Sequence, residues 1–157
     1  MIVYHGSNIL YGPEIYCPSI FNELHRGKDI MTAYKKAQIM LEKLNNFDDT
    51  FSLQRALDDA QTTSDNSPFI STSQKRDVAR QFATTKNGQG YIYTIEGPEK
   101  EFYNFNEIRS SCNLPQHKTF NWMGELGIPF EIKLPFEIVQ IEKIIEIKEI
   151  TELIYQK

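Results

Sequence analysis

Hydrophobic positions change from a helical to a strand-like spacing about halfway along the chain. Between Asp29 and Asn45, apolar side chains recur every three or four residues, and lysines lie on the opposite face. A second helical pattern runs from about Thr50 to Gln61. Asp29 precedes the first pattern and is a suitable N-cap, because its carboxylate can accept a hydrogen bond from a first-turn amide. The predicted apolar face of this helix consists of Met31, Tyr34, Ala37, Met40, Leu41 and Leu44.

Runs of aromatic and β-branched residues predict strands in the rest of the chain. Residues 2–4 form the first run, and Pro13 and Pro18 then predict an extended or looped segment. Residues 69–70 lead through three hydroxyl side chains into a helix that should direct Val78, Ala79, Phe82 and Ala83 inward. Further strand-like runs cover residues 91–95, 101–105, 125–134 and 136–150. Helices gathered early and strands gathered late predict one α+β domain over residues 1–157.

Composition supports an ordinary globular domain without a metal site. The chain has 157 residues, of which 40% are apolar and 24% charged, so it can bury one hydrophobic core. Its net charge of −4 argues against bulk attraction to a nucleic-acid backbone. Cys17 and Cys112 lie far apart, and neither has a Cys or His at zinc-ligand spacing, so we expect two free thiols and no metal.

The opening residues lack a basic segment followed by a long apolar run. We therefore expect no signal peptide and no membrane span. The expected location is the cytoplasm, or a target cell reached by a route that the sequence does not reveal.

The first polar motif, His5, Gly6 and Ser7, ends the first predicted strand. A histidine here can donate a hydrogen bond to a ribose hydroxyl, and a glycine lets a planar amide approach the backbone closely. A surface turn after a strand would explain the same residues without any ligand.

The second motif is the run Ser71, Thr72 and Ser73, which leads from a strand into a helix. Ser73 could simply be the N-cap of that helix. An N-cap alone does not explain three consecutive hydroxyls directly after two large apolar residues.

The third motif is a carboxylate, Glu125, which opens an apolar strand after an aromatic loop. An isolated Glu is usually a solvated surface residue. The preceding loop suggests instead that this Glu lies at the edge of a cleft. The loop residues are Phe120, Asn121, Trp122 and Met123.

In this order the three motifs resemble the ADP-ribosyltransferase superfamily, in particular the bacterial mono-ADP-ribosyltransferase toxins. Cholera-toxin-like members combine a first-strand motif, a Ser-Thr-Ser strand and a later strand that begins with a catalytic Glu. The resemblance implies two small antiparallel sheets around an NAD cleft, with the N-terminal helices on one side. It covers most of the chain except residues 29–62, and each motif taken alone is weak.

The resemblance also implies a role for each motif, with NAD as a substrate and no metal. Glu125 would be the catalytic carboxylate, and Ser71 would hold it in position. The residues implied to bind NAD are His5, Gly6, Ser7, Ser71, Thr72 and Ser73. The loop of Phe120, Asn121, Trp122 and Met123 would recognise the acceptor.

Two departures from the family pattern and one competing register leave alternatives open. His5 stands where cholera-like enzymes have Arg, so its motif looks more like that of the diphtheria-toxin and poly-ADP-ribose polymerase branch. Met123 replaces the Glu or Gln that engages the acceptor, which disfavours arginine as the modified group. Glu131 lies in a competing pattern that also resembles the catalytic strand.

The expected activity is transfer of ADP-ribose from NAD to a macromolecule, either protein or nucleic acid. An NAD glycohydrolase of the same fold and an inactive module that binds NAD or ADP-ribose are the alternatives. A secreted effector, a toxin of a toxin–antitoxin pair and a phage-defence effector all fit the sequence. An antitoxin or immunity protein would then be a partner, whereas no membrane partner is expected.

Overall fold

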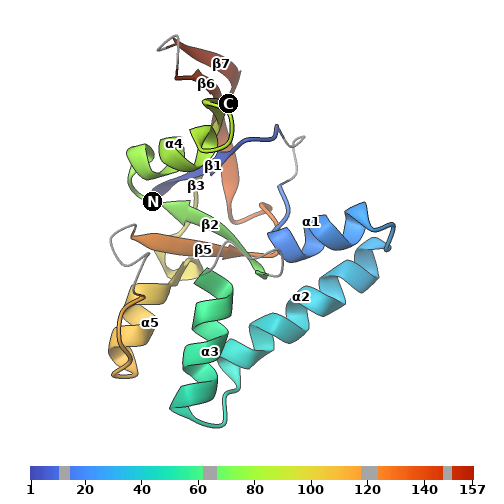
Figure 1. Cartoon of the computed structure of the whole chain (residues 1–157), viewed down its shortest axis with the longest axis vertical. Coiled ribbons are helices and arrows are strands. Elements are labelled where there is room, and N and C mark those ends of the chain that lie inside the picture. Colours follow the sequence, from blue (N-terminus) through green and yellow to red (C-terminus); the bar gives the residue numbers. More distant parts are fainter. Residues whose placement is uncertain (11–14, 62–66, 118–123, 147–149) are drawn as a thin grey trace.

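The computed structural model describes residues 1–10, 15–61, 67–117, 124–146 and 150–157. The helices are α1 (Pro18–His25), α2 (Ile30–Asn45), α3 (Thr50–Gln61), α4 (Arg76–Thr84), the 3₁₀ turn η1 (Glu99–Glu101) and α5 (Phe105–Ser111). The strands are β1 (Ile2–Ser7), β2 (Phe69–Ser73), β3 (Gln89–Glu96), β4 (Tyr103–Asn104), β5 (Glu125–Pro129), β6 (Glu137–Ile145) and β7 (Ile150–Gln156). Figure 1 shows the helices of the first half of the chain grouped together, with α4 apart from them.

The strands form one seven-stranded antiparallel sheet in the order β4-β5-β2-β1-β3-β6-β7. The predicted α+β class with antiparallel strands is therefore confirmed. The expected division into two separate sheets is not found, because β1 and β2 join the two halves. They do so through a single residue pair, Tyr4 with Ser73, whereas β1 pairs with β3 along its whole length from Ile2 to Ser7.

Helices cover both faces of this sheet. In β3, Tyr93 and Ile95 pack in the main core with Ala33 of α2, whereas Ile92 packs with Ala83 of α4. Because neighbouring residues of a strand point to opposite faces, α4 and α2 lie on opposite sides. A second apolar cluster joins α3 and α5 to β2 through Leu53, Leu57, Phe69 and Phe105.

Two of the predicted helices lie where the sequence pattern places them. Asp29 caps α2 by accepting a hydrogen bond from the Thr32 amide at 2.7 Å. The helix α3 spans the predicted residues, Thr50–Gln61. Cys17 and Cys112 are both free thiols, as expected.

Other predictions of local structure were wrong. Pro18 does not keep its segment extended; it opens α1, because proline fits the first turn of a helix, where its missing N–H is not needed. The run at residues 101–105 contains only a two-residue strand, and α5 begins at Phe105. Phe82 was expected in the core, yet 37% of its surface is exposed on α4.

Candidate functional site

The candidate site lies where β1 and β2 diverge. From the pair Tyr4–Ser73, β1 continues towards Ser7 while β2 runs back towards Phe69, and no further pair joins the two strands in the part of the chain that is described. Ser71 lies on the β2 side of this fork, and its side chain is exposed. On its other edge, β2 stays paired with β5 over five residues, which sets Glu125 opposite Ser73.

Ser71 and Glu125 are in direct contact. The Ser71 hydroxyl donates a short hydrogen bond to Oε2 of Glu125. The contact follows from the register, because Ser71 and Ser73 point to the same face of β2 and Glu125 lies beside Ser73. Only 6% of the Glu125 surface is exposed, so the carboxyl is buried whereas the serine that holds it is not.

His5 is tied to the same serine through the backbone. Its Nδ1 lies 2.7 Å from the carbonyl oxygen of Ser71. A carbonyl only accepts hydrogen bonds, so Nδ1 carries the hydrogen. Burial lowers the pKa of His5, and the neutral ring then has Nε2 as an acceptor. His5 was expected to donate to a ribose hydroxyl, but in this tautomer the free ring nitrogen, Nε2, is an acceptor.

The environment of Glu125 raises the pKa of its carboxyl to about 7. Burial is the largest cause, because removal from water disfavours the charged form. Three neighbours act in the opposite direction: the Ser71 hydroxyl, the Gln61 side chain and the positive charge of Arg109. The carboxyl is therefore poised to change its charge near neutral pH, as is common for groups that take part in catalysis.

Arg109 and Gln61 are site residues that sequence reasoning missed. Arg109 is only 1% exposed, and its Nε donates to Oε1 of Gln61 at 2.7 Å. A second nitrogen donates to Asp58 at 2.7 Å, and a third donates to the Pro115 carbonyl at 3.2 Å. The sequence held one signal for this polar cluster: Asp58 and Gln61 are three residues apart, so they share one face of α3. No pattern in the sequence indicated that a cation from α5 would lie against that face.

Two polar atoms of the site are buried without a hydrogen-bond partner in the described part of the chain. They are Nε2 of Gln61 and Oε1 of Glu125, a donor and an acceptor. Gln61 lies near enough to favour the charged form of Glu125, yet the two atoms do not form a hydrogen bond with good geometry. Unpaired buried polar atoms are unfavourable and are typical of strained or functional positions.

The other residues of the Ser-Thr-Ser run support the strands. Thr72 is buried and donates to the Leu126 carbonyl at 2.7 Å, which fastens β2 to β5. Ser73 is also buried, and its hydroxyl accepts a hydrogen bond from the Lys75 amide at 3.0 Å. The N-cap of α4 is Lys75, so Ser73 shapes the turn before this helix and is not its cap.

Gly6 and Ser7 serve the fold at the end of β1. A Cβ on Gly6 would lie 1.9 Å from the carbonyl oxygen of Ala79, so only glycine lets β1 pack this closely against α4. The Ser7 hydroxyl accepts a hydrogen bond from the Ile9 amide at 3.1 Å and is nearly buried. These contacts account for both residues without a ligand.

The competing carboxylate, Glu131, lies in a different environment. It pairs with Tyr16 in an isolated bridge just beyond β5, and its carboxylate lies 3.3 Å from the Lys133 ammonium. Burial and this carboxylate raise the pKa of the Tyr34 hydroxyl on α2. No contact among the described residues joins Glu131 to Ser71 or His5, so the structure brings Glu125 and not Glu131 to the fork.

Several expectations fall outside the site or outside the described residues. The loop residues Phe120, Asn121, Trp122 and Met123 belong to a segment that the structure does not describe. Within the described residues, no group of three or more His, Cys, Asp or Glu side chains is arranged to hold a metal ion. No helix in the described ranges is both long and apolar enough to cross a membrane.

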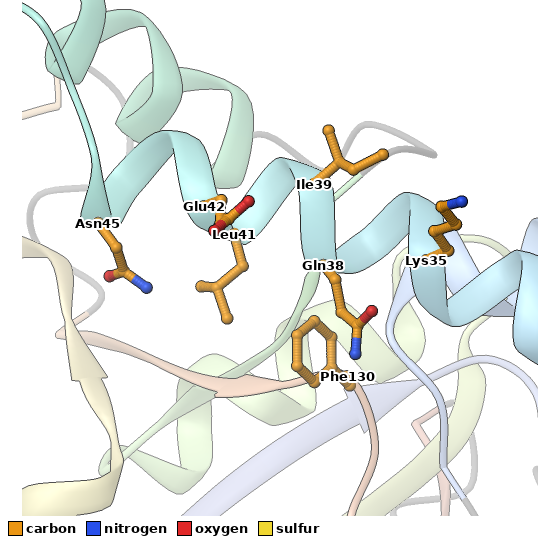
Figure 2. Close-up of a pocket in the computed structure, with 7 residues that line it drawn as sticks. All are labelled: Lys35, Gln38, Ile39, Leu41, Glu42, Asn45 and Phe130. Carbon is orange, nitrogen blue, oxygen red and sulfur yellow. The ribbon is translucent and has the colours of Figure 1, made fainter.

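A pocket of about 460 Å³ lies along α2, but it does not include the fork. Figure 2 shows Gln38 and Leu41 directed from the helix towards the Phe130 ring, whereas Ile39 points away. None of the residues lining this pocket belongs to the group around Glu125. Its ionisable lining residues are Lys35 and Glu42, and no histidine, cysteine or serine lines it.

No family model and no curated protein matches the sequence of this chain.

Proposed function

We propose that this protein is a mono-ADP-ribosyltransferase, which cleaves NAD at the bond between nicotinamide and ribose and transfers ADP-ribose to a macromolecular acceptor. One observation carries the proposal. A buried carboxyl, Glu125, is held by the exposed Ser71, and the backbone of that serine is held by a neutral His5. Residues from three motifs separated along the sequence thus meet at one point of the sheet, which supports the roles that the resemblance implies for them.

The proposed reaction needs a carboxylate more than it needs a proton donor. Cleavage passes through an oxocarbenium-like state, as in glycoside hydrolysis, and the nicotinamide leaves as a neutral group from a cationic precursor. A carboxylate that accepts a hydrogen bond from a ribose hydroxyl stabilises the developing cation. With a pKa of about 7, part of the Glu125 population is charged at neutral pH, and a nearby positive charge on the substrate favours that form further.

His5 and Ser71 suit the recognition of a ribose in this reaction. The acceptor atom Nε2 of His5 can receive a hydrogen bond from a ribose hydroxyl, because Nδ1 is already engaged with Ser71. The Ser71 side chain is exposed at the fork, so a ligand can reach it while it holds Glu125. Ser71 therefore holds the carboxyl, His5 holds the backbone of Ser71, and each of the two residues has a polar group suited to a sugar hydroxyl.

The test is incubation of the purified protein with NAD labelled in its ADP-ribose part and with whole-cell lysate. We expect labelled macromolecules, and protease or nuclease treatment of the product identifies the acceptor as protein or nucleic acid. Glu125→Gln should lower turnover by about a hundred- to a thousandfold, because it removes one preorganised charge from the site. Glu131→Gln makes the same chemical change away from the fork and should retain near-normal activity.

Other outcomes separate the alternatives. Free ADP-ribose without labelled macromolecules would indicate an NAD glycohydrolase. NAD bound but not consumed would indicate an inactive binding module. A greater loss in Glu131→Gln than in Glu125→Gln would show that the catalytic strand has been assigned to the wrong carboxylate.

A further inference from the structure

Arg109 of α5 is hydrogen-bonded to α3, and its positive charge lies near enough to the Glu125 carboxyl to affect its pKa. Its side chain is almost fully buried, yet each of its three nitrogens has an oxygen partner: Gln61, Asp58 and the Pro115 carbonyl. A buried cation is costly unless it is paired and hydrogen-bonded, and this one is. The geometry of α3 and α5 at this point is therefore well determined.

This arrangement fixes the orientation of the Gln61 amide. A guanidinium has only donors, so the atom of Gln61 that lies 2.7 Å from Nε of Arg109 must be the oxygen. The oxygen and the NH₂ group occupy opposite corners of an amide. The NH₂ group consequently points away from Arg109, and it is buried without a partner among the described residues.

The atom that needs this donor is on Glu125. Ser71 donates a hydrogen bond to Oε2 of the carboxyl, whereas Oε1 is buried and has no hydrogen-bond partner in the described part of the protein. We propose that Gln61 is a positioning residue for Glu125: Arg109 orients its amide so that the NH₂ group is presented to Oε1, and the hydrogen bond closes when the carboxyl is charged. The contribution to turnover rests on the function proposed above, whereas the contact itself does not.

The charges around Glu125 agree with this role. Gln61 and Arg109 both lower the pKa of its carboxyl and oppose the effect of burial. Asp58 faces the same arginine from α3 and pairs with it, so it offsets part of the positive charge. His5, which approaches from β1 through the Ser71 backbone, has a lowered pKa and adds no charge at neutral pH.

The test is direct titration of Glu125 by carbon NMR on protein with labelled glutamate carboxyl groups. Glu125→Gln assigns the signal, because it removes that resonance alone. Replacing Gln61 by Leu keeps a side chain of similar size but removes the donor, so the Glu125 midpoint should rise by about one pH unit. Gln61→Glu keeps the oxygen towards Arg109 and replaces the donor by a second carboxyl oxygen, so the rise should be larger.

Gln54→Leu is the matched control, because Gln54 is a half-buried glutamine two turns earlier on the same helix. Its Glu125 midpoint should equal that of the wild type. An unchanged midpoint in the Gln61 variants would overturn the inference, and so would an equal shift in Gln54→Leu. If Gln61→Leu fails to fold, Gln61→Met replaces it, because methionine also lacks the N–H donor and adds no charge.

Activity measurements separate this inference from the proposed function. With NAD turnover present, Gln61→Leu should lower kcat at pH 7 and shift the acidic limb of the pH profile upward by the same interval as the NMR midpoint. NAD affinity should change by less than about twofold, since the residue acts through Glu125 and not on the substrate. A shifted NMR midpoint in a protein that never consumes NAD would refute the proposed function and leave the Gln61 contact standing.

Discussion

Glu125→Gln should make the folded protein more stable at alkaline pH, although the change is expected to abolish most activity. In the folded protein the carboxyl has a pKa of about 7, compared with 4.5 for an ordinary glutamate side chain in water. Between these two values the unfolded chain has lost the proton and the folded protein still holds it, so stability falls as pH rises through this window. A difference of about 2.5 pKa units corresponds to about 3 kcal/mol. This part of the stability is fully present below pH 4.5 and is lost as the pH rises to about 7.

A glutamine side chain cannot ionise, so the variant does not incur this penalty. The informative quantity is the change with pH of the stability difference between variant and wild type, because any packing defect of the substituted side chain is the same at every pH. We expect this difference to move in favour of the variant by about 3 kcal/mol from pH 4 to pH 8. For a chain of this length that equals roughly 6–12 °C in Tm at the unfolding midpoint.

Urea unfolding at several pH values, followed by far-UV circular dichroism, measures the effect. Glu131→Gln is the control, because it neutralises a carboxylate that lies beside Lys133 and not one buried beside Ser71. It should show no gain of this size towards alkaline pH. A stability difference for Glu125→Gln that stays flat from pH 4 to pH 8 would refute the assignment of a buried, easily protonated carboxyl.

Three further predictions concern the fold, the chemistry and the acceptor. Gly6→Ala should destabilise the protein by about 1–3 kcal/mol or more in urea unfolding, because the new Cβ meets backbone atoms of Ala79 and α4 must move; stability equal to the wild type would contradict the packing described for β1. Chelators should leave NAD consumption unchanged, since a leaving group that departs neutral needs no Lewis acid; activity lost with chelator and restored by a divalent ion would point to another enzyme class. Trp122→Ala should reduce transfer to the acceptor far more than hydrolysis of NAD by water, and an equal loss of both would remove the acceptor role from its loop.

Much of the fold could be predicted because its signals are local. The helices α2 and α3 follow from three- and four-residue spacing and, for α2, from the cap at Asp29. The segment after Pro18 was mispredicted because proline is compatible both with a loop and with the first turn of a helix. The joining of the two half-sheets depends on one long-range residue pair, which no local pattern specifies.

Some residues of the candidate site could be predicted from local motifs, and others could not. Ser71 and Glu125 could be named because their motifs resemble those of a known family, and the register of β2 and β5 brings them together. Arg109 and Gln61 could not be named, because each looks like a polar residue on a helix surface. Their burial depends on how α3 packs against α5, and that packing is decided by apolar neighbours such as Leu57 and Phe105.

The fork between β1 and β2 gives the sheet a pair of internal edges. Beyond Tyr4 and Ser73 the two strands are no longer hydrogen-bonded to each other. Main-chain groups that a neighbouring strand would normally engage therefore face the opening, and the His5 side chain binds one of them, the Ser71 carbonyl. An unpaired strand edge invites another extended chain to add to it. A carboxamide such as that of nicotinamide carries the same donor and acceptor as a peptide group, so it could be received here in the way an edge receives an added strand. Recognition of a carboxamide by main-chain groups depends on the path of the backbone and little on the identity of the side chains that line the opening.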